Sequence, residues 1–176
     1  TSRSENRRNQ QNHSEIRLLD VESGEIRQLT ENRAPESRLV WAPDGQSLAY
    51  TARTDGEWEL MLDKIWIMDP ESGDKRMVSG AFDGNISTFV WTPDASAILF
   101  SGLQGTNNNL FRLDVGSGDV VKVTSALGSL SPSSFSRDRT RMAYVFQDFD
   151  TPSDVWIGPT DGSSAGGVQP TICMSR

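Results

Sequence analysis

Short apolar runs alternate along the chain with clusters of Gly, Pro, Asp and Ser. The runs hold four to seven residues and are rich in Val, Ile, Leu, Trp, Phe and Tyr, which is the composition typical of β-strands. No segment shows a convincing 3.6-residue period of an amphipathic helix. The pattern therefore predicts an all-β fold.

A first family of repeats has the form I-R-L-L-D-V-E-S-G-E-I-R-Q-L-T. Its copies begin at Ile16, Ile65 and Leu110 and, in degenerate form, at Val155, so the starts are 49, 45 and 45 residues apart. A Ser-Gly step in each of the first three copies places glycine where a short hairpin loop requires a positive φ. We therefore expect two antiparallel strands to flank each of these turns.

A second family, typified by W-A-P-D-G-Q-S-L-A-Y, interleaves with the first. Its turns are marked by aspartates 50 and 44 residues apart: Asp44, Asp94 and Asp138. In the first copy Pro43 pre-sets φ and Gly45 supplies a left-handed residue, which predicts another tight reversal. Ala95 and Arg139 replace this glycine in the later copies. If the positive φ is kept, each replacement should lower the folding stability by about 1 kcal/mol. If it is not kept, these two turns could differ in type from the first.

Two hairpins per period of about 45 residues make four strands per repeat, which matches the blade of a β-propeller. The sequence predicts an incomplete propeller of about three and a half four-stranded antiparallel blades. We expect a polar, flexible leader over residues 1–14 and a half-blade over 15–30. Three blades should follow, and their approximate ranges are 38–79, 86–124 and 133–176.

An open arc of blades leaves apolar sheet faces uncovered at both ends, whereas closed propellers typically have four to eight blades. We therefore expect partners that cover these faces. The candidates are the missing blades of a longer polypeptide, other copies of the chain in a homo-oligomer, or both.

Composition narrows the classes of function. The chain has 17 Lys and Arg against 24 Asp and Glu, a net charge of −7, which argues against binding nucleic acid by neutralising phosphates. The sequence contains no run of about 18 apolar residues that would predict a membrane span. The polar stretch up to His13 does not resemble a secretory signal. Cys173 is the single cysteine and His13 the single histidine. We expect neither an internal disulfide nor a metal or cofactor site.

The repeats W-A-P-D-G-Q-S-L-A-Y and D-V-E-S-G-E-I-R-Q-L-T resemble the WD40-like repeats of TolB-type propellers. They also resemble those of the N-terminal propellers of the prolyl oligopeptidase family of serine peptidases, which includes dipeptidyl peptidase IV and the acylaminoacyl peptidases. The resemblance spans residues 15 to about 163. The stretch from Ser133 to Ile157 is similar to a late propeller blade of these enzymes and favours the peptidase branch.

The resemblance implies a role without chemistry in this chain. Catalysis in that family belongs to a Ser, an Asp and a His on an α/β-hydrolase domain, with the Ser in a G-x-S-x-G motif. The sequence contains no such motif, and its one histidine lies in the polar leader. We therefore expect no catalytic residue here. The expected function is to restrict and orient peptide substrates for a separate hydrolase domain. The alternative is a TolB-like propeller that binds a protein partner and has no associated enzyme activity.

Tryptophans are the first candidates for a binding site. Trp41 and Trp91 occupy equivalent repeat positions, as do Trp66 and Trp156, so we expect these four to pack between blades. Trp58 differs, because it lies in the segment that lengthens its repeat from 45 to 49 residues. Long loops on a rigid scaffold often bind partners.

Trp58, Leu60 and Met61 form the candidate partner-contact loop, which would face a neighbouring domain or another protomer. The alternative for this loop is that the flanking strands extend further and pack Trp58 and Leu60 on one face. A cluster of Asp148, Asp150 and Asp154 suggests calcium, but it lacks the glycine and distal glutamate of an EF-hand loop. We interpret these aspartates as solvated turn carboxylates.

Overall fold

The computed structural model describes residues 2–3, 14–31, 34–53 and 61–161. These residues form fifteen strands and no helix, so the predicted all-β fold is confirmed, and no helix among them could cross a membrane. The strands are β1 (Ser2–Arg3), β2 (Ser14–Glu15), β3 (Arg17–Leu19), β4 (Ile26–Gln28), β5 (Ser37–Trp41), β6 (Leu48–Ala52), β7 (Lys64–Met68), β8 (Lys75–Met77), β9 (Asn85–Trp91), β10 (Ala97–Gln104), β11 (Asn107–Asp114), β12 (Val120–Lys122), β13 (Ser129–Phe135), β14 (Arg141–Gln147) and β15 (Asp154–Pro159).

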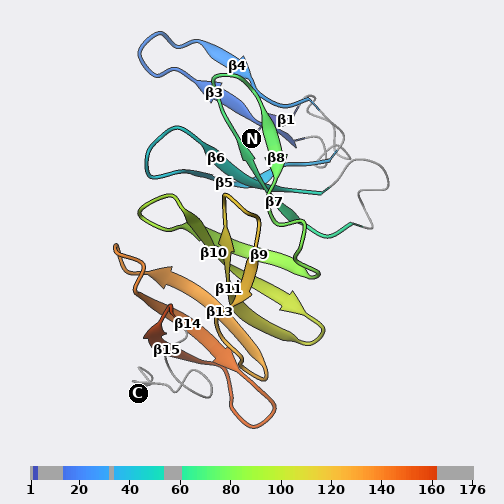
Figure 1. Ribbon diagram of the computed structural model, residues 1–176, viewed down its shortest axis with the longest axis vertical. Coiled ribbons are helices and arrows are strands. Elements are labelled where there is room, and N and C mark those ends of the chain that lie inside the picture. Colours follow the sequence, from blue (N-terminus) through green and yellow to red (C-terminus); the bar gives the residue numbers. More distant parts are fainter. Residues whose placement is uncertain (1, 4–13, 32–33, 54–60, 162–176) are drawn as a thin grey trace. The chain divides into compact units, whose positions relative to one another are not determined.

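The chain divides into an N-terminal unit, residues 1–78, and a C-terminal unit, residues 79–176. The N-terminal unit contains the antiparallel meander β5-β6-β7-β8, the hairpin β3-β4 and the short pair β1-β2 (Figure 1). Ser2 and Arg3, inside the predicted leader, pair with Glu15 and Ser14. The sheet β5–β8 thus has the four strands that the two repeated hairpins predict.

The C-terminal unit contains a second meander, β9-β10-β11-β12, and the three strands β13-β14-β15 (Figure 1). A parallel pairing of Asn108 with Ser129 joins the two groups into one seven-stranded sheet. The Asn108 side chain strengthens this junction, because its Nδ2 donates to the carbonyl oxygen of Leu130 over 3.0 Å and its Oδ1 accepts from Ser101. All the other pairings are antiparallel.

The turns of the first repeat family are built on an aspartate. Glycine follows serine in each turn and has a positive φ of 76° at Gly24 and 79° at Gly73 and Gly118, as the sequence predicts. The carboxylate at the start of each turn accepts backbone N–H groups two and three residues ahead, which lowers the pKa of each of these exposed carboxyl groups. The aspartates are Asp20, Asp69 and Asp114.

The turns of the second repeat family keep one geometry despite the loss of glycine. Gly45 has a φ of 72°, and its replacements Ala95 and Arg139 have φ values of 57° and 59°. In all three turns the N–H of this residue donates to the carbonyl three positions earlier over 2.9–3.0 Å. The expectation that these turns could differ in type is therefore wrong, and the predicted strain of a left-handed non-glycine residue is present at both positions.

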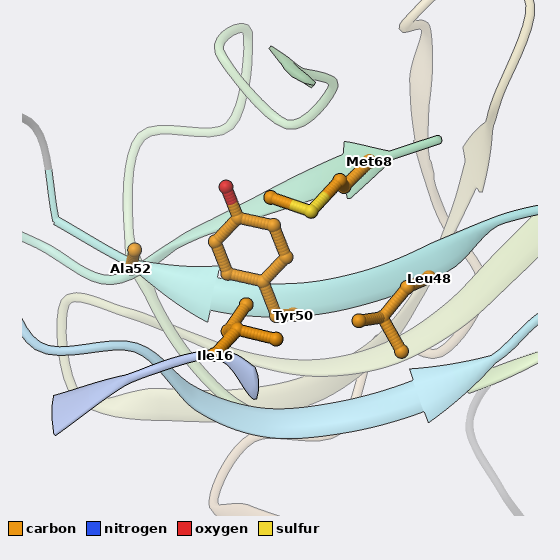
Figure 2. Packing of buried hydrophobic residues seen from close by; sticks show 5 residues of the cluster. All are labelled: Ile16, Leu48, Tyr50, Ala52 and Met68. Carbon is orange, nitrogen blue, oxygen red and sulfur yellow. The ribbon is translucent and has the colours of Figure 1, made fainter. Parts of the chain in front are cut away.

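Each unit has its own apolar core. In the N-terminal unit the ring of Tyr50 lies among Ile16, Leu48 and Met68, so the residue preceding β3 packs against strands β6 and β7 (Figure 2). Burial raises the pKa of the Tyr50 hydroxyl, and the nearby Glu36 carboxylate adds to this effect. One core cluster of the C-terminal unit combines residues from both strand groups: Leu99, Leu110, Leu130, Met142 and Tyr144. The alternation of apolar positions along the strands produces both cores.

Candidate partner-contact site

The candidate partner-contact loop belongs to the connection between β6 and β7. The ladder between these strands ends at the pair Ala52–Lys64. Beyond it, Arg53 Nε lies 3.3 Å from Asp63 Oδ1, and both side chains are about one-third exposed. The indole of Trp66 donates to the carbonyl oxygen of Ala52 over 3.2 Å. These contacts fix the base of the connection to the sheet.

The residues of the predicted loop are only partly described. Trp58 and Leu60 lie outside the described residues, as do the histidine and the cysteine of the chain, His13 and Cys173. Met61 is described and is 45% exposed, and the next residue, Leu62, is also exposed. An exposed apolar pair at the base of this connection agrees with a partner contact, which stays a prediction.

The equivalent connection between β10 and β11 is much shorter. The ladder there continues to the pair Gln104–Asn107, so Gly105 and Thr106 alone form the turn, and Gly105 has a φ of 59°. A two-residue turn with left-handed glycine matches the twist of the flanking strands. The additional length between β6 and β7 is therefore an insertion into a tight hairpin position.

Asp148, after β14, is used as a turn carboxylate. Asp148 Oδ1 accepts the backbone N–H groups of Asp150 and Thr151 over 3.0 and 2.7 Å, and the Thr151 side chain and these N–H groups lower the pKa of Asp148. Asp154 accepts the N–H of Val155 over 2.7 Å. Within the described ranges, no group of three His, Cys, Asp or Glu side chains is arranged to hold a metal ion.

The repeated tryptophans do not all pack as predicted. Trp91 is 4% exposed, and Trp66 and Trp156 are partly buried against the cores of their own units. Trp41, the repeat equivalent of Trp91, is 47% exposed. The prediction of core packing is therefore wrong for Trp41, because repeat equivalence fixes the position of a residue on its strand but not what covers that residue.

A hollow of about 570 Å³ lies in the C-terminal unit between two turns of the second repeat family. Its lining consists of Pro93 from the β9–β10 turn and Ser136, Arg137 and Asp138 from the β13–β14 turn. The Asp138 carboxylate already accepts hydrogen bonds from the Ser136 hydroxyl and from the N–H and hydroxyl of Thr140, which lower its pKa. This carboxylate therefore serves the turn.

The chain is similar in sequence and in fold to several known proteins. No protein-family model matches the chain. Dipeptidyl-peptidase 5 of Porphyromonas gingivalis is 23% identical over 154 residues, which cover 86% of this chain and 22% of that protein. The crystal structure of TolB from Acinetobacter baumannii matches 88% of this chain and 36% of its own, with a TM-score of 0.65 and 22% identity. Dipeptidyl peptidase 4 of Porphyromonas gingivalis matches 93% of this chain and 30% of its own, with a TM-score of 0.64 and 11% identity.

The chain is a segment of a β-propeller. The predicted resemblance to the propellers of the prolyl oligopeptidase family and of TolB is confirmed, and so is the predicted fold class. The segment spans about one-fifth of the length of the dipeptidyl-peptidase that it resembles.

Proposed function

We propose that this propeller segment belongs to a prolyl oligopeptidase-like serine peptidase, in which it restricts and orients peptide substrates for a separate α/β-hydrolase domain. The mechanism is steric. A propeller beside an active site admits short or unfolded peptides and excludes folded proteins, while the acyl-transfer chemistry takes place on the other domain.

The similarity to dipeptidyl-peptidase 5 over 154 residues carries this proposal. The composition of the chain supports it, because no G-x-S-x-G motif and only one histidine are present. The described residues form sheets and turns, and the carboxylates of Asp114, Asp138 and Asp148 accept hydrogen bonds within their own turns. Such a scaffold suits gating better than proton transfer.

The decisive test starts from the complete polypeptide that contains this segment. A G-x-S-x-G motif followed by Asp and His on a hydrolase domain would support the peptidase. The complete enzyme should hydrolyse a short peptide and leave the same sequence uncut within a folded protein. The 176-residue chain alone should hydrolyse neither peptides nor esters. Turnover by this chain that survives repurification and changes with His13→Ala would contradict the proposal.

The second candidate is a TolB-like interaction propeller with no associated enzyme activity. The likeness to the Acinetobacter baumannii TolB structure favours it, at a TM-score of 0.65 over 88% of the chain. A complete polypeptide that contains further blades and no hydrolase domain would support this candidate.

A further inference from the structure

Arg38 has a strained backbone that its position in the repeat does not explain. It lies in β5 with a φ of 54°, in the left-handed region that is unfavourable for a residue with a Cβ. The other described non-glycine residues with a positive φ are Ala95 and Arg139, which occupy a turn position that is glycine in the first repeat. The repeat equivalents of Arg38 are Thr88 and Ser133, neither of which is glycine.

The strained residue is the first residue of a bulge in β5. The pairing of β5 with β6 shifts register between Ser37 and Val40. Arg38 and Leu39 therefore stand opposite the single residue Tyr50, and Leu39 packs against the core around Tyr50. A bulge whose first residue is left-handed normally has glycine at that position. Here the position holds an arginine, and this arginine is exposed.

Two further bulges show that a bulge in these strands does not require a left-handed residue. The register of β9 shifts at Ser87, and that of β13 shifts at Ser133. Both serines are exposed, and neither has a positive φ. The left-handed backbone is therefore particular to Arg38. Backbone strain of this kind persists where a binding or catalytic site requires it.

The two left-handed arginines differ in the use of their side chains. The Arg139 guanidinium donates to the carbonyl oxygens of Trp91 and Ser136, each over 3.3 Å, and so holds its turn to β9. The Arg38 guanidinium makes no hydrogen bond or ion pair with any residue that the structure describes. Its charge therefore has no structural use in this part of the chain.

The chemistry of the bulge fits a peptide that carries a carboxylate. A guanidinium binds a carboxylate through two parallel N–H donors, and such charge-assisted pairs are stronger than neutral hydrogen bonds. β5 is also the edge strand of its sheet, and extended peptides bind along exposed strand edges. The net charge of −7 repels acidic peptides from the chain as a whole, so a preference for them requires a local cation.

We propose that Arg38 is a specificity residue that binds a carboxylate of the peptide substrate, an inference that rests on the proposed function. The carboxylate is either the C-terminus of the peptide or an acidic side chain. Glycine at position 38 would relieve the strain but would remove the charge of the bulge. Stability and binding therefore make opposite demands on this residue.

The test measures the equilibrium binding of three acetylated peptides to the complete polypeptide, with the catalytic serine of a hydrolase domain replaced by alanine so that the peptides stay intact. The peptides are Ala-Pro-Ala with a free C-terminus, Ala-Pro-Ala amide and Ala-Pro-Glu amide. A carboxylate peptide should bind about tenfold or more tightly than the neutral amide, and the peptide that does so identifies the C-terminus or the side chain as the source. Arg38→Gln should abolish the preference, and Arg38→Lys should restore part of it.

Two further variants separate binding from folding. Arg38→Gly should raise the Tm, because it relieves the strain, and should abolish the preference for carboxylates. A residue with a structural role alone would not give this combination. Arg141→Gln is the matched control, because Arg141 is exposed in the regular strand β14 and its side chain has no hydrogen bond among the described residues. This control should keep the preference.

The outcomes distinguish this assignment from the proposed function. Equal affinity of the wild type for the three peptides, or a preference that survives Arg38→Gln, would overturn the role of Arg38 and leave the proposed function intact. A preference that Arg141→Gln also abolishes would indicate general charge attraction and overturn it as well. A lower Tm in Arg38→Gly would remove the strain on which the assignment depends. A polypeptide that prefers carboxylate peptides but has no hydrolase domain would overturn the proposed function alone.

Discussion

The hydroxyl oxygen of Thr124 accepts a hydrogen bond from the backbone N–H of Leu110 over 2.9 Å. The same relationship recurs in the N-terminal unit, where Thr30 accepts from the N–H of Ile16 over 2.8 Å. In both hairpins the threonine follows the second strand and accepts from the first residue of its repeat, which is Ile16 or Leu110. The final threonine of the repeat therefore has a structural function, which is to close the hairpin ladder.

Substituting Thr124 by Val should destabilise the C-terminal unit by about 1–3 kcal/mol, because it leaves the buried N–H of Leu110 unsatisfied and removes the donor to Asn109 Oδ1. Urea unfolding would measure the loss. Thr124→Ser keeps the hydroxyl and should retain most of the stability. A larger loss in Thr124→Ser than in Thr124→Val would mean that the methyl group, which valine keeps and serine lacks, matters more than the hydrogen bond.

The strain at Ala95 can be tested with a reciprocal pair. Ala95→Gly should stabilise the protein by about 1 kcal/mol, because glycine adopts the φ of 57° without steric cost. Gly45→Ala should destabilise it by a similar amount, since a Cβ at Gly45 would meet no atom within 4 Å and only the φ of 72° opposes it. Thermal unfolding would measure both. Shifts of the same sign in the two variants would contradict this account.

Much of the fold could be predicted from residues with a local physical requirement. Gly24, Gly73 and Gly118 could be placed in turns because only glycine adopts their positive φ cheaply. The strand pairs on either side follow from the alternation of apolar residues. The shifts of register in β5, β9 and β13 could not be predicted, because a bulge adds one residue without a characteristic side chain. The positive φ of 54° at Arg38, in the bulge of β5, likewise has no sequence signal.

The candidate site was accessible from the sequence only through loop length. The additional residues around Met61 stand out because the equivalent hairpin turns at Gly105. Arg38 is a single arginine within a predicted strand, so no periodicity marks it. Its bulge depends on the shift of register between Ser37 and Val40, which the sequence does not specify.

The stability of the C-terminal unit should depend on pH through Asp94. The hydroxyls of Thr92 and Ser96 and the N–H of Ser96 donate to its carboxylate and lower its pKa from 3.8 to about 2. Because this pKa is depressed in the folded state, the stabilisation is present above pH 3.8 and is lost as the pH falls towards 2. Asp94→Asn should lower the Tm at pH 6, and the difference from the wild type should shrink between pH 4 and pH 2. A Tm difference between Asp94→Asn and the wild type that stays constant with pH would contradict the assignment to Asp94.

Trp91 and Trp41 should differ in their contribution to stability although they occupy equivalent positions. Trp91 pairs with Ile98 and is almost fully buried, so Trp91→Ala should cost about 3–5 kcal/mol. Trp41 pairs with Leu48 but keeps nearly half of its surface in water, so Trp41→Ala should cost roughly 1–2 kcal/mol. Urea unfolding monitored by circular dichroism would compare the stabilities of the two variants without relying on tryptophan fluorescence. Equal losses of stability would mean that Trp41 is covered in solution. Acrylamide should then quench the fluorescence of Trp41 less than its exposure in the structure implies.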